Sequence, residues 1–240
     1  MEEVKRIIKE VIHLNGSDKI MLSFSTGKDA WATWSAIKDL CDVYPFMYYG
    51  PIDDLEYYQE YLAYCEKKIG RHIVRLPAPN TYQSLGAKAL TYQPPHRCLV
   101  LEGINLPQFT FEDVQKAAAN CWGLPENTYT ALGVRAADSN RRALHFKKHG
   151  PISIKQKKFY PVWHWKKDDL LSALTRENVK LPIDYKIFGR SFDGGYLLFA
   201  QKFKQHFPRD YQRMVEFFPF LELEFYRYEK RQTLHNFQGQ

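Results

Sequence analysis

The sequence predicts an α/β fold with a mostly parallel, doubly wound sheet and a smaller helical C-terminal part. Between residues 19 and 79, short apolar runs alternate with stretches of helical periodicity. A strand–helix–strand–helix–strand order implies parallel strands joined by crossover helices. From residue 181 on, the chain is rich in aromatic and charged residues with mostly helical spacing. We therefore expect an α/β domain over residues 1–180 and a helical extension over residues 181–240.

The first half of the chain supplies the alternating pattern. Near the N-terminus, apolar residues recur at the spacing of an amphipathic helix over residues 2–13. Buried strands are expected where short apolar runs end in turn residues, at 19–24, 42–50 and 71–79. The intervening helices are expected at 29–39 and 54–70.

The second half continues with longer connections. Residues 80–110 carry scattered proline and glycine and are expected to be rich in loops. A basic span over residues 145–160 is expected to be an excursion on the surface. The remaining elements expected before residue 181 are a helix, a strand and a helix, at 111–123, 128–134 and 166–178.

The composition limits the classes of protein that the chain can belong to. Its 240 residues carry a net charge of +7 and a pI of about 9.1, which suits binding of phosphates, nucleotides or nucleic acid without selecting among them. The four cysteines lie far apart, so no metal-ligand spacing is present. No signal-peptide pattern begins the chain, and no apolar run approaches the roughly 18 residues of a membrane-spanning helix. We expect a cytoplasmic protein with reduced thiols and no membrane contact.

The turn after the first expected strand, FSTGKD at residues 24–29, has the composition of an anion site. It opens a helix, and the first amide groups of a helix are unpaired and favour negative charge. Gly27 allows a tight turn and close approach of a ligand. Ser25 and Thr26 add hydroxyl groups, and Lys28 adds a cation. The sequence therefore predicts a phosphate or pyrophosphate cradle; the alternative is a turn whose glycine serves only steric needs. The standard P-loop and dinucleotide-binding patterns are missing.

The segment SFSTGKDAWATW resembles the PP-loop of the ATP pyrophosphatase superfamily, whose pattern after the first strand is Ser-Gly-Gly-x-Asp-Ser. The lysine before the aspartate resembles the branch that includes phosphoadenylylsulfate (PAPS) reductases, sulfate adenylyltransferase small subunits and DNA sulfur-modification enzymes. Thr26 replaces the first glycine of the pattern, and Ala30 replaces its last serine. The residues that align with the pattern are Ser25, Thr26, Gly27, Lys28, Asp29 and Ala30.

Further segments resemble the same family in the same order, over about residues 17–195. YYGPIDDLEYYQEYL resembles its acidic segment before a helix, and YPVWHWKKDDLLSAL resembles its Pro-Trp-Asp segment. PPHRCLVLE faintly resembles an Arg-Trp-Cys-Thr segment, without the tryptophan and with Leu99 in place of the threonine. LGVRAADSNRR resembles the Gly-x-Arg-x-x-Glu-Ser-x-x-Arg segment through five residues: Gly133, Arg135, Asp138, Ser139 and Arg142.

The resemblance implies an adenine-nucleotide-alpha-hydrolase-like fold that binds ATP or an adenylyl sulfate nucleotide and cleaves the α–β phosphate bond. Lys28, Asp29, Arg135 and Arg142 are the implied catalytic residues. Asp29 and Asp54 are the implied ligands of Mg²⁺, although each aspartate can instead stabilise a helix start. The implied nucleotide contacts are Ser23, Ser25, Thr26, Gly27, Lys28, Asp29, Ala30, Asp53, Gly133, Arg135 and Ser139.

The departures from the family pattern leave alternatives open. PAPS reductases attack sulfur with a cysteine in the C-terminal tail, and this chain has no cysteine after Cys121. Cys98 is the one candidate nucleophile near a family motif; the alternative is that it is a small buried apolar residue. The second substrate is unknown. The alternatives are a nucleotide- or nucleic-acid-binding module without catalysis, and a PAPS reductase that uses a partner's thiol.

Two features beyond the motifs concern partners. The basic strip KKHGPISIKQKK is expected on a loop or hairpin, and it can follow a phosphate backbone or simply face solvent. Tyr196, Phe199, Phe203 and Phe207 fall at helical spacing among basic residues. They favour a helix that packs on the core or on a second subunit, with nucleic-acid stacking as the alternative. A homodimer and a nucleic-acid partner are therefore both compatible with the sequence.

Overall fold

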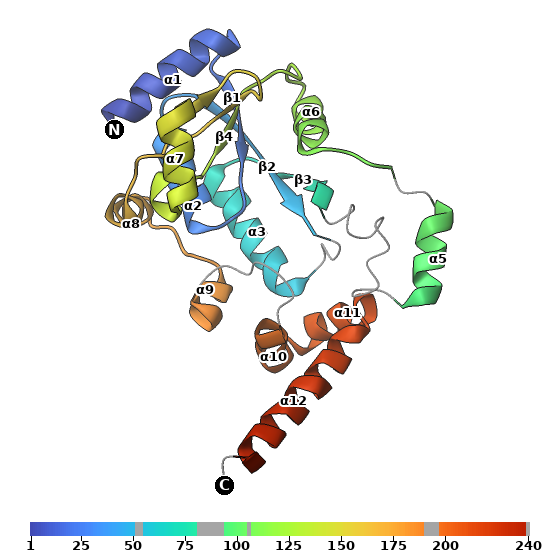
Figure 1. Cartoon of the computed structure of the whole chain (residues 1–240). Helices are drawn as coiled ribbons and strands as arrows, with labels where there is room; N and C mark the ends of the chain where they lie inside the picture. Colours follow the sequence, from blue (N-terminus) through green and yellow to red (C-terminus); the bar gives the residue numbers. More distant parts are fainter. Residues whose placement is uncertain (51–54, 81–93, 105–106, 190–196, 239–240) are drawn as a thin grey trace. The chain divides into compact units, whose positions relative to one another are not determined.

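The computed structural model describes residues 1–240 except 51–54, 81–93, 105–106, 190–196 and 239–240. Its described part contains a six-stranded sheet in the order β3-β2-β1-β4-β6-β5 (Figure 1). The strands are β1 (Lys19–Ser23), β2 (Asp42–Tyr49), β3 (Val74–Pro77), β4 (Thr130–Leu132), β5 (Ile152–Ser153) and β6 (Lys158–Phe159). All neighbouring strands are parallel except β5 and β6, which are antiparallel. The predicted α/β class with a mostly parallel sheet is confirmed.

Helices connect and follow these strands. Before residue 181 the described helices are α1 (Glu2–Asn15), α2 (Lys28–Ile37), α3 (Glu56–Ile69), α5 (Pro95–Ile104), α6 (Phe111–Cys121), α7 (Asn140–His149) and α8 (Lys167–Arg176), with a short 3₁₀ turn η1 (Ala136–Asp138). The C-terminal helices are α9 (Ile183–Phe188), α10 (Leu197–His206), α11 (Pro208–Phe217) and α12 (Phe220–Gln238). None of the helices in the described part is long and apolar enough to cross a bilayer.

The structure adds detail to two local expectations. Residues 80–110 were expected to be rich in loops, and their described part also contains α5, which starts at Pro95, a residue whose fixed φ suits the first helical position. The basic span 145–160 was expected to be a surface excursion; it consists of the end of α7 followed by the β5–β6 hairpin, and only Phe146 and Phe159 in it are buried. Ser139 caps α7 by accepting a hydrogen bond from the Arg142 amide at 3.2 Å.

The chain groups into two compact units. The first contains residues 1–49, 62–77 and 109–182; the second contains residues 50–61, 78–108 and 183–240. The C-terminal helices therefore share their unit with two segments from earlier in the chain. The border proposed from the sequence, between residues 180 and 181, stays a prediction.

One part of the core of the first unit lies where the sheet meets α6. Met21 of β1 and Phe46 of β2 pack against Ala118 and Ala119 of α6, and all four side chains are almost fully buried. The small alanine side chains let the helix backbone lie close to the sheet. Burial of each large apolar side chain contributes about 1.5–3 kcal/mol, so this contact fixes the sheet on which the site stands.

The second unit has its own aromatic core, centred on Phe203 of α10. Phe203 has no exposed surface and lies among Leu55, Tyr211, Met214 and Phe225. This placement matches the packing interpretation of the aromatic series for Phe203, while Tyr196 lies outside the described residues. The buried carboxylate of Asp210 is held by backbone amides, accepting hydrogen bonds from Glu56 at 2.7 Å and Tyr57 at 3.0 Å.

Candidate functional site

The order of the strands marks a position for a ligand. β1 has β2 on one side and β4 on the other, so the chain reverses its direction of progress across the sheet between β1 and β4. In open α/β sheets, ligands bind at such a switch point, outside the carboxyl ends of the strands. Ser23 and Leu132 are paired in register at the ends of these two strands. The segments that follow them, residues 24–27 and 133–139, therefore border the expected crevice.

The turn after β1 has a strained backbone. Thr26 adopts a φ of 60°, in the left-handed region, and is 3% exposed. A β-branched residue pays on the order of 1–3 kcal/mol for such a conformation and keeps it only where its surroundings hold it. The sequence assigned the tight turn to Gly27, but Gly27 has an ordinary φ of −76°. Thr26 makes the unusual turn, and Gly27 is the N-cap of α2.

The segment after β4 lies directly against the start of α2. A Cβ atom added to Gly133 would be 2.7 Å from the Asp29 carbonyl oxygen and 3.0 Å from Thr33 Oγ1. The Thr33 hydroxyl donates a hydrogen bond of 2.8 Å to that same carbonyl. Only glycine at position 133 therefore allows the end of β4 to approach the first turn of α2 this closely.

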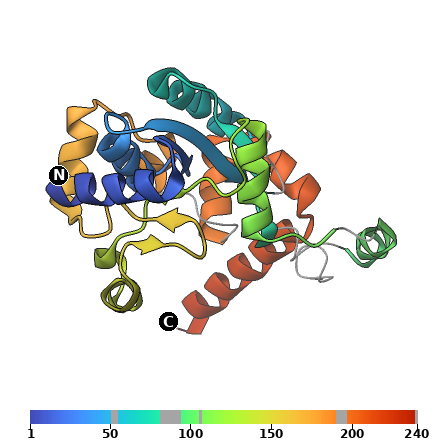
Figure 2. The ribbon, with the colours of Figure 1, turned by 90° about the horizontal axis from the view of Figure 1, so that it is seen from above.

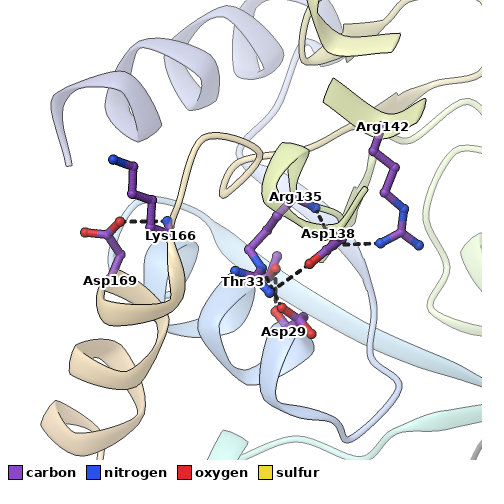
Figure 3. Close-up of polar contacts among 7 residues, drawn as sticks. All are labelled: Asp29, Thr33, Arg135, Asp138, Arg142, Lys166 and Asp169. Carbon is purple, nitrogen blue, oxygen red and sulfur yellow. Dashed lines mark hydrogen bonds and ion pairs between the residues drawn. The ribbon is translucent and has the colours of Figure 1, made fainter. Parts of the chain in front are cut away.

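A chain of four charges joins the two segments (Figure 3). Arg135 Nε donates to Asp29 Oδ1 at 2.7 Å, and Arg135 Nη2 donates to Asp138 Oδ1 at 2.8 Å. Arg142 Nη1 donates to Asp138 Oδ2 at 2.6 Å. The Arg135 side chain is 9% exposed, whereas that of Arg142 is 49% exposed. Arg135 thus fixes α2 to the segment after β4, and Arg142 forms the open end of the chain.

The structure brings most of the predicted site residues to this end of the sheet. Ser23 ends β1, Lys28 and Asp29 begin α2, and Arg135 contacts Asp29. Some side chains already have structural contacts: the Ser139 hydroxyl caps α7, and Ala30 is buried in α2. Ser25 is exposed. Asp53 and Asp54 lie outside the described residues.

Of the two predicted Mg²⁺ ligands, Asp29 and Asp54, only Asp29 lies within the described residues. Its Oδ1 atom accepts the hydrogen bond from Arg135, and within the described residues Oδ2 accepts none. Mg²⁺ is commonly bound by one or two carboxylates together with substrate phosphates and water. One carboxylate oxygen at the expected position of the phosphates fits that pattern. In the described part of the chain no cluster of three His, Cys, Asp or Glu side chains could hold a metal without such help.

A cavity of about 370 Å³ adjoins the site and was not foreseen from the sequence. Its walls come from the end of β4, from α7 and from the residue after β6. Leu132, Phe146 and Tyr160 form its apolar side, and Arg141 and His145 add polar groups. Arg141 could have been predicted to lie near the site, because it is adjacent to Arg142 in the family-like segment LGVRAADSNRR. Nothing local in the sequence places Tyr160 beside α7.

The start of α8 has a capping role. The family-like segment YPVWHWKKDDLLSAL contains Asp169, whose Oδ2 accepts a hydrogen bond of 2.8 Å from the Lys166 amide (Figure 3). This pairing satisfies one of the free amide groups at the helix start. The position thus has a structural explanation that requires no ligand.

The cysteines differ in access, and we expect a thiol reagent to distinguish them. Cys121 is exposed, whereas Cys65 and Cys98 are buried. Burial raises the pKa of the Cys41 thiol to about 12, so little thiolate forms there at neutral pH. The native protein should show one fast-reacting thiol at pH 8, and the unfolded protein should show all four. A Cys121→Ser variant is the control, because it should lose the fast phase; a fast phase that persists would show that a buried thiol is reactive.

Comparisons with known proteins reveal distant similarities of fold. No protein-family model and no curated protein matches the sequence. Among solved structures, the U34-tRNA thiolase NcsA from Methanococcus maripaludis is 13% identical, with 89% of this chain and 76% of that chain covered and a TM-score of 0.45. The NH3-dependent NAD synthetase from Campylobacter jejuni is 14% identical over 100% of this chain and 94% of that chain, with a TM-score of 0.44. The NAD+ synthetase from Burkholderia pseudomallei is 14% identical over 76% and 68%, with a TM-score of 0.43. At such scores these names say nothing of what this chain binds.

Proposed function

We propose that the chain is a PP-loop enzyme, similar to PAPS reductases, which binds ATP or a related adenylyl nucleotide. It cleaves the α–β phosphate bond to activate a second substrate, with sulfur or amide transfer as the reaction that follows. The observation that supports this most is the strained turn at Thr26, which lies at the switch point of the sheet and leads directly into α2. Strained backbone at such a position is typical of a binding site.

The start of α2 is suited to phosphate groups. Its N-cap is Gly27, which has no side chain to satisfy the first amide groups, whereas Thr110 caps α6 and Ser139 caps α7. A helix start without a side-chain cap, together with the helix dipole, favours an anion. The charges of Asp29, Arg135, Asp138 and Arg142 sum to zero, so the added positive charge for a phosphate comes from Lys28.

The chemistry requires little covalent participation by the protein. An oxygen of the second substrate attacks the α-phosphorus, the bond to the bridging oxygen breaks, and pyrophosphate leaves with the electron pair. Mg²⁺, when bound through the phosphates and Asp29, would neutralise charge on the leaving group. Lys28 would stabilise the phosphate oxygens. Arg142 is exposed enough to reach them, and Arg135 keeps Asp29 in position.

Two alternatives remain, each favoured by one observation. Ala30 replaces the serine of the PP-loop pattern and is 2% exposed, which favours a nucleotide-binding module without catalysis. Cys98 is 7% exposed, so a PAPS reductase built on this chain would need a thiol from a partner. Measuring pyrophosphate release and thioredoxin-dependent sulfite release distinguishes these alternatives from the proposed reaction.

Calorimetric titration of the wild type and of Lys28→Ala with ATP tests the proposal. A charged hydrogen bond is worth about 1.5–3 kcal/mol, so the variant should bind ATP at least about tenfold more weakly. Adenylyl sulfate and PAPS are titrated in parallel, with and without Mg²⁺. The matched control is Lys19→Ala, which removes an exposed lysine at the opposite end of β1 and should leave ATP binding unchanged. Equal ATP affinity for the two variants would exclude Lys28 from the site.

A further inference from the structure

One stretch of the chain concentrates positive charge. Residues 139–167 contain no aspartate or glutamate. Their basic residues are Arg141, Arg142, Lys147, Lys148, Lys155, Lys157, Lys158, Lys166 and Lys167, with His145, His149 and His164 in addition. Nine formal positive charges exceed the net charge of +7 of the whole chain, so the rest of the protein is slightly acidic. Solubility alone does not require such a local excess of one sign.

Four of these cations are exposed and have no ion-pair partner among the described residues, whereas Arg142 pairs with Asp138 and Lys157 and Lys158 are half-buried. Within the described residues no ion pair forms at Arg141, Lys147, Lys148 or Lys155, and all four are exposed. α1 behaves differently, because Lys5 pairs with Glu2 at 3.1 Å and Arg6 pairs with Glu3 at 2.8 Å. The unpaired cations therefore produce a positive potential that extends into solvent.

The start of α7 carries charges that its own stability disfavours. Helices α1, α2, α6 and α8 each have an acidic residue in the first turn, where the helix dipole favours negative charge. α7 has none, and Arg141 and Arg142 occupy that turn instead. The dipole explains Lys147 and Lys148 in the last turn, but it opposes the two arginines in the first.

The basic residues belong to one continuous part of the first unit. Gly150 and Pro151 join α7 directly to β5, and α7 lies beside the β5–β6 hairpin in both views (Figures 1 and 2). The Tyr160 amide donates to the Pro151 carbonyl at 2.9 Å, and the ring centroids of Tyr160 and Phe146 are 5.2 Å apart. The cavity of about 370 Å³ opens among these same elements and is bordered by Arg141 and Arg142.

We propose that α7 and the β5–β6 hairpin, with residues 139–160, form a binding surface for single-stranded nucleic acid, and that the cavity takes one of its nucleotides. We refer to these residues as the basic surface. Regularly spaced phosphates match cations distributed along a helix and a hairpin. A membrane surface is a poorer match, because it requires a continuous apolar helix face, and the exposed large apolar residues here are Leu144 and Ile154. The proposal rests on charge and geometry, and it does not depend on the proposed ATP chemistry.

Fluorescence anisotropy with a labelled single-stranded RNA of about 20 nucleotides tests this surface, at several salt concentrations and without nucleotide. The test variant carries Arg141→Gln, Lys148→Gln and Lys155→Gln. At 50 mM salt it should bind at least about tenfold more weakly than the wild type, because three phosphate contacts are lost. The slope of log affinity against log salt should fall by about 2, at roughly 0.7 per phosphate contact.

The matched control removes the same charge elsewhere in the first unit, with Lys5→Gln, Lys9→Gln and Lys116→Gln. It should keep the affinity within about twofold and the wild-type salt slope. Arg141→Gln and Lys155→Gln are also measured singly, so that a folding defect in the triple variant does not decide the result. Single-stranded and duplex DNA of the same sequence show which strand type is preferred.

Three results would overturn the proposal: no RNA binding by the wild type at 50 mM salt, equal weakening by the two triple variants, or binding only to phosphatidylserine vesicles. ATP titration of the test variant separates this proposal from the previous one. None of its three substituted residues is assigned to the nucleotide site, so ATP binding should remain unchanged whether or not RNA binding is lost.

Discussion

Replacing Arg135 with alanine is expected to lower the free energy of unfolding by about 3–5 kcal/mol, the usual cost of removing one partner from a buried ion pair. Arg135 is 9% exposed and is the common partner of Asp29 and Asp138, whose side chains are 29% and 20% exposed. Without it, Asp29 loses its cation and Asp138 keeps only Arg142. The connection between the start of α2 and the segment after β4 is lost as well.

Urea unfolding followed by circular dichroism measures this effect, and the structure provides a matched control. Arg142→Ala removes the same type of charge from Asp138, but its side chain is 49% exposed, so the expected loss is below about 1 kcal/mol. Arg135→Lys should fall between the two, because an ammonium group cannot contact both carboxylates in the geometry of a guanidinium. Equal losses for the two alanine variants would show that Arg135 does not connect the two segments.

Local patterns in the sequence predict strands β1 to β4 because these are short, apolar and flanked by amphipathic helices, whereas β5 and β6 have two residues each, too few to show a period. β1 runs from Lys19 to Ser23 and α2 starts at Lys28, within one residue of the limits expected from periodicity. The glycine-bearing turn between them is located correctly for the same reason. The limits of a single strand, helix or turn can thus be predicted, because they depend on residues that are close together in the sequence.

Contacts between distant parts of the chain cannot be predicted from such local patterns. The left-handed residue is Thr26, although propensity favours Gly27, because the surroundings of a buried turn override the preference of a residue. Arg135 and Asp29 are 106 residues apart, and only the parallel pairing of β1 with β4 brings them together. Sequence reasoning assigned Arg135 to phosphate binding, a role that stays a prediction, and it did not foresee the contact with Asp29.

Substitution of Gly133 by alanine is the second change with a large expected effect. Its new Cβ atom would be 2.7 Å from the Asp29 carbonyl oxygen and 2.8 Å from the carbonyl carbon, both backbone atoms that no change of rotamer can move. The first turn of α2 must shift, which strains the turn at Thr26. Overpacking of this kind costs about 1–3 kcal/mol, and a displaced phosphate cradle should weaken ATP binding at least about tenfold.

Gly103→Ala is the control for Gly133→Ala, because it makes the same chemical change where there is room for a methyl group. Gly103 lies within α5, and an added Cβ atom there meets no atom within 4 Å. Alanine favours a helix over glycine by about 1 kcal/mol, so this variant should be as stable as the wild type or slightly more stable. Unfolding by urea and titration with ATP are measured for both variants. If Gly133→Ala loses stability but binds ATP normally, the contact between β4 and α2 is needed only for folding. If it loses both, the same contact also holds the phosphate cradle in its binding conformation.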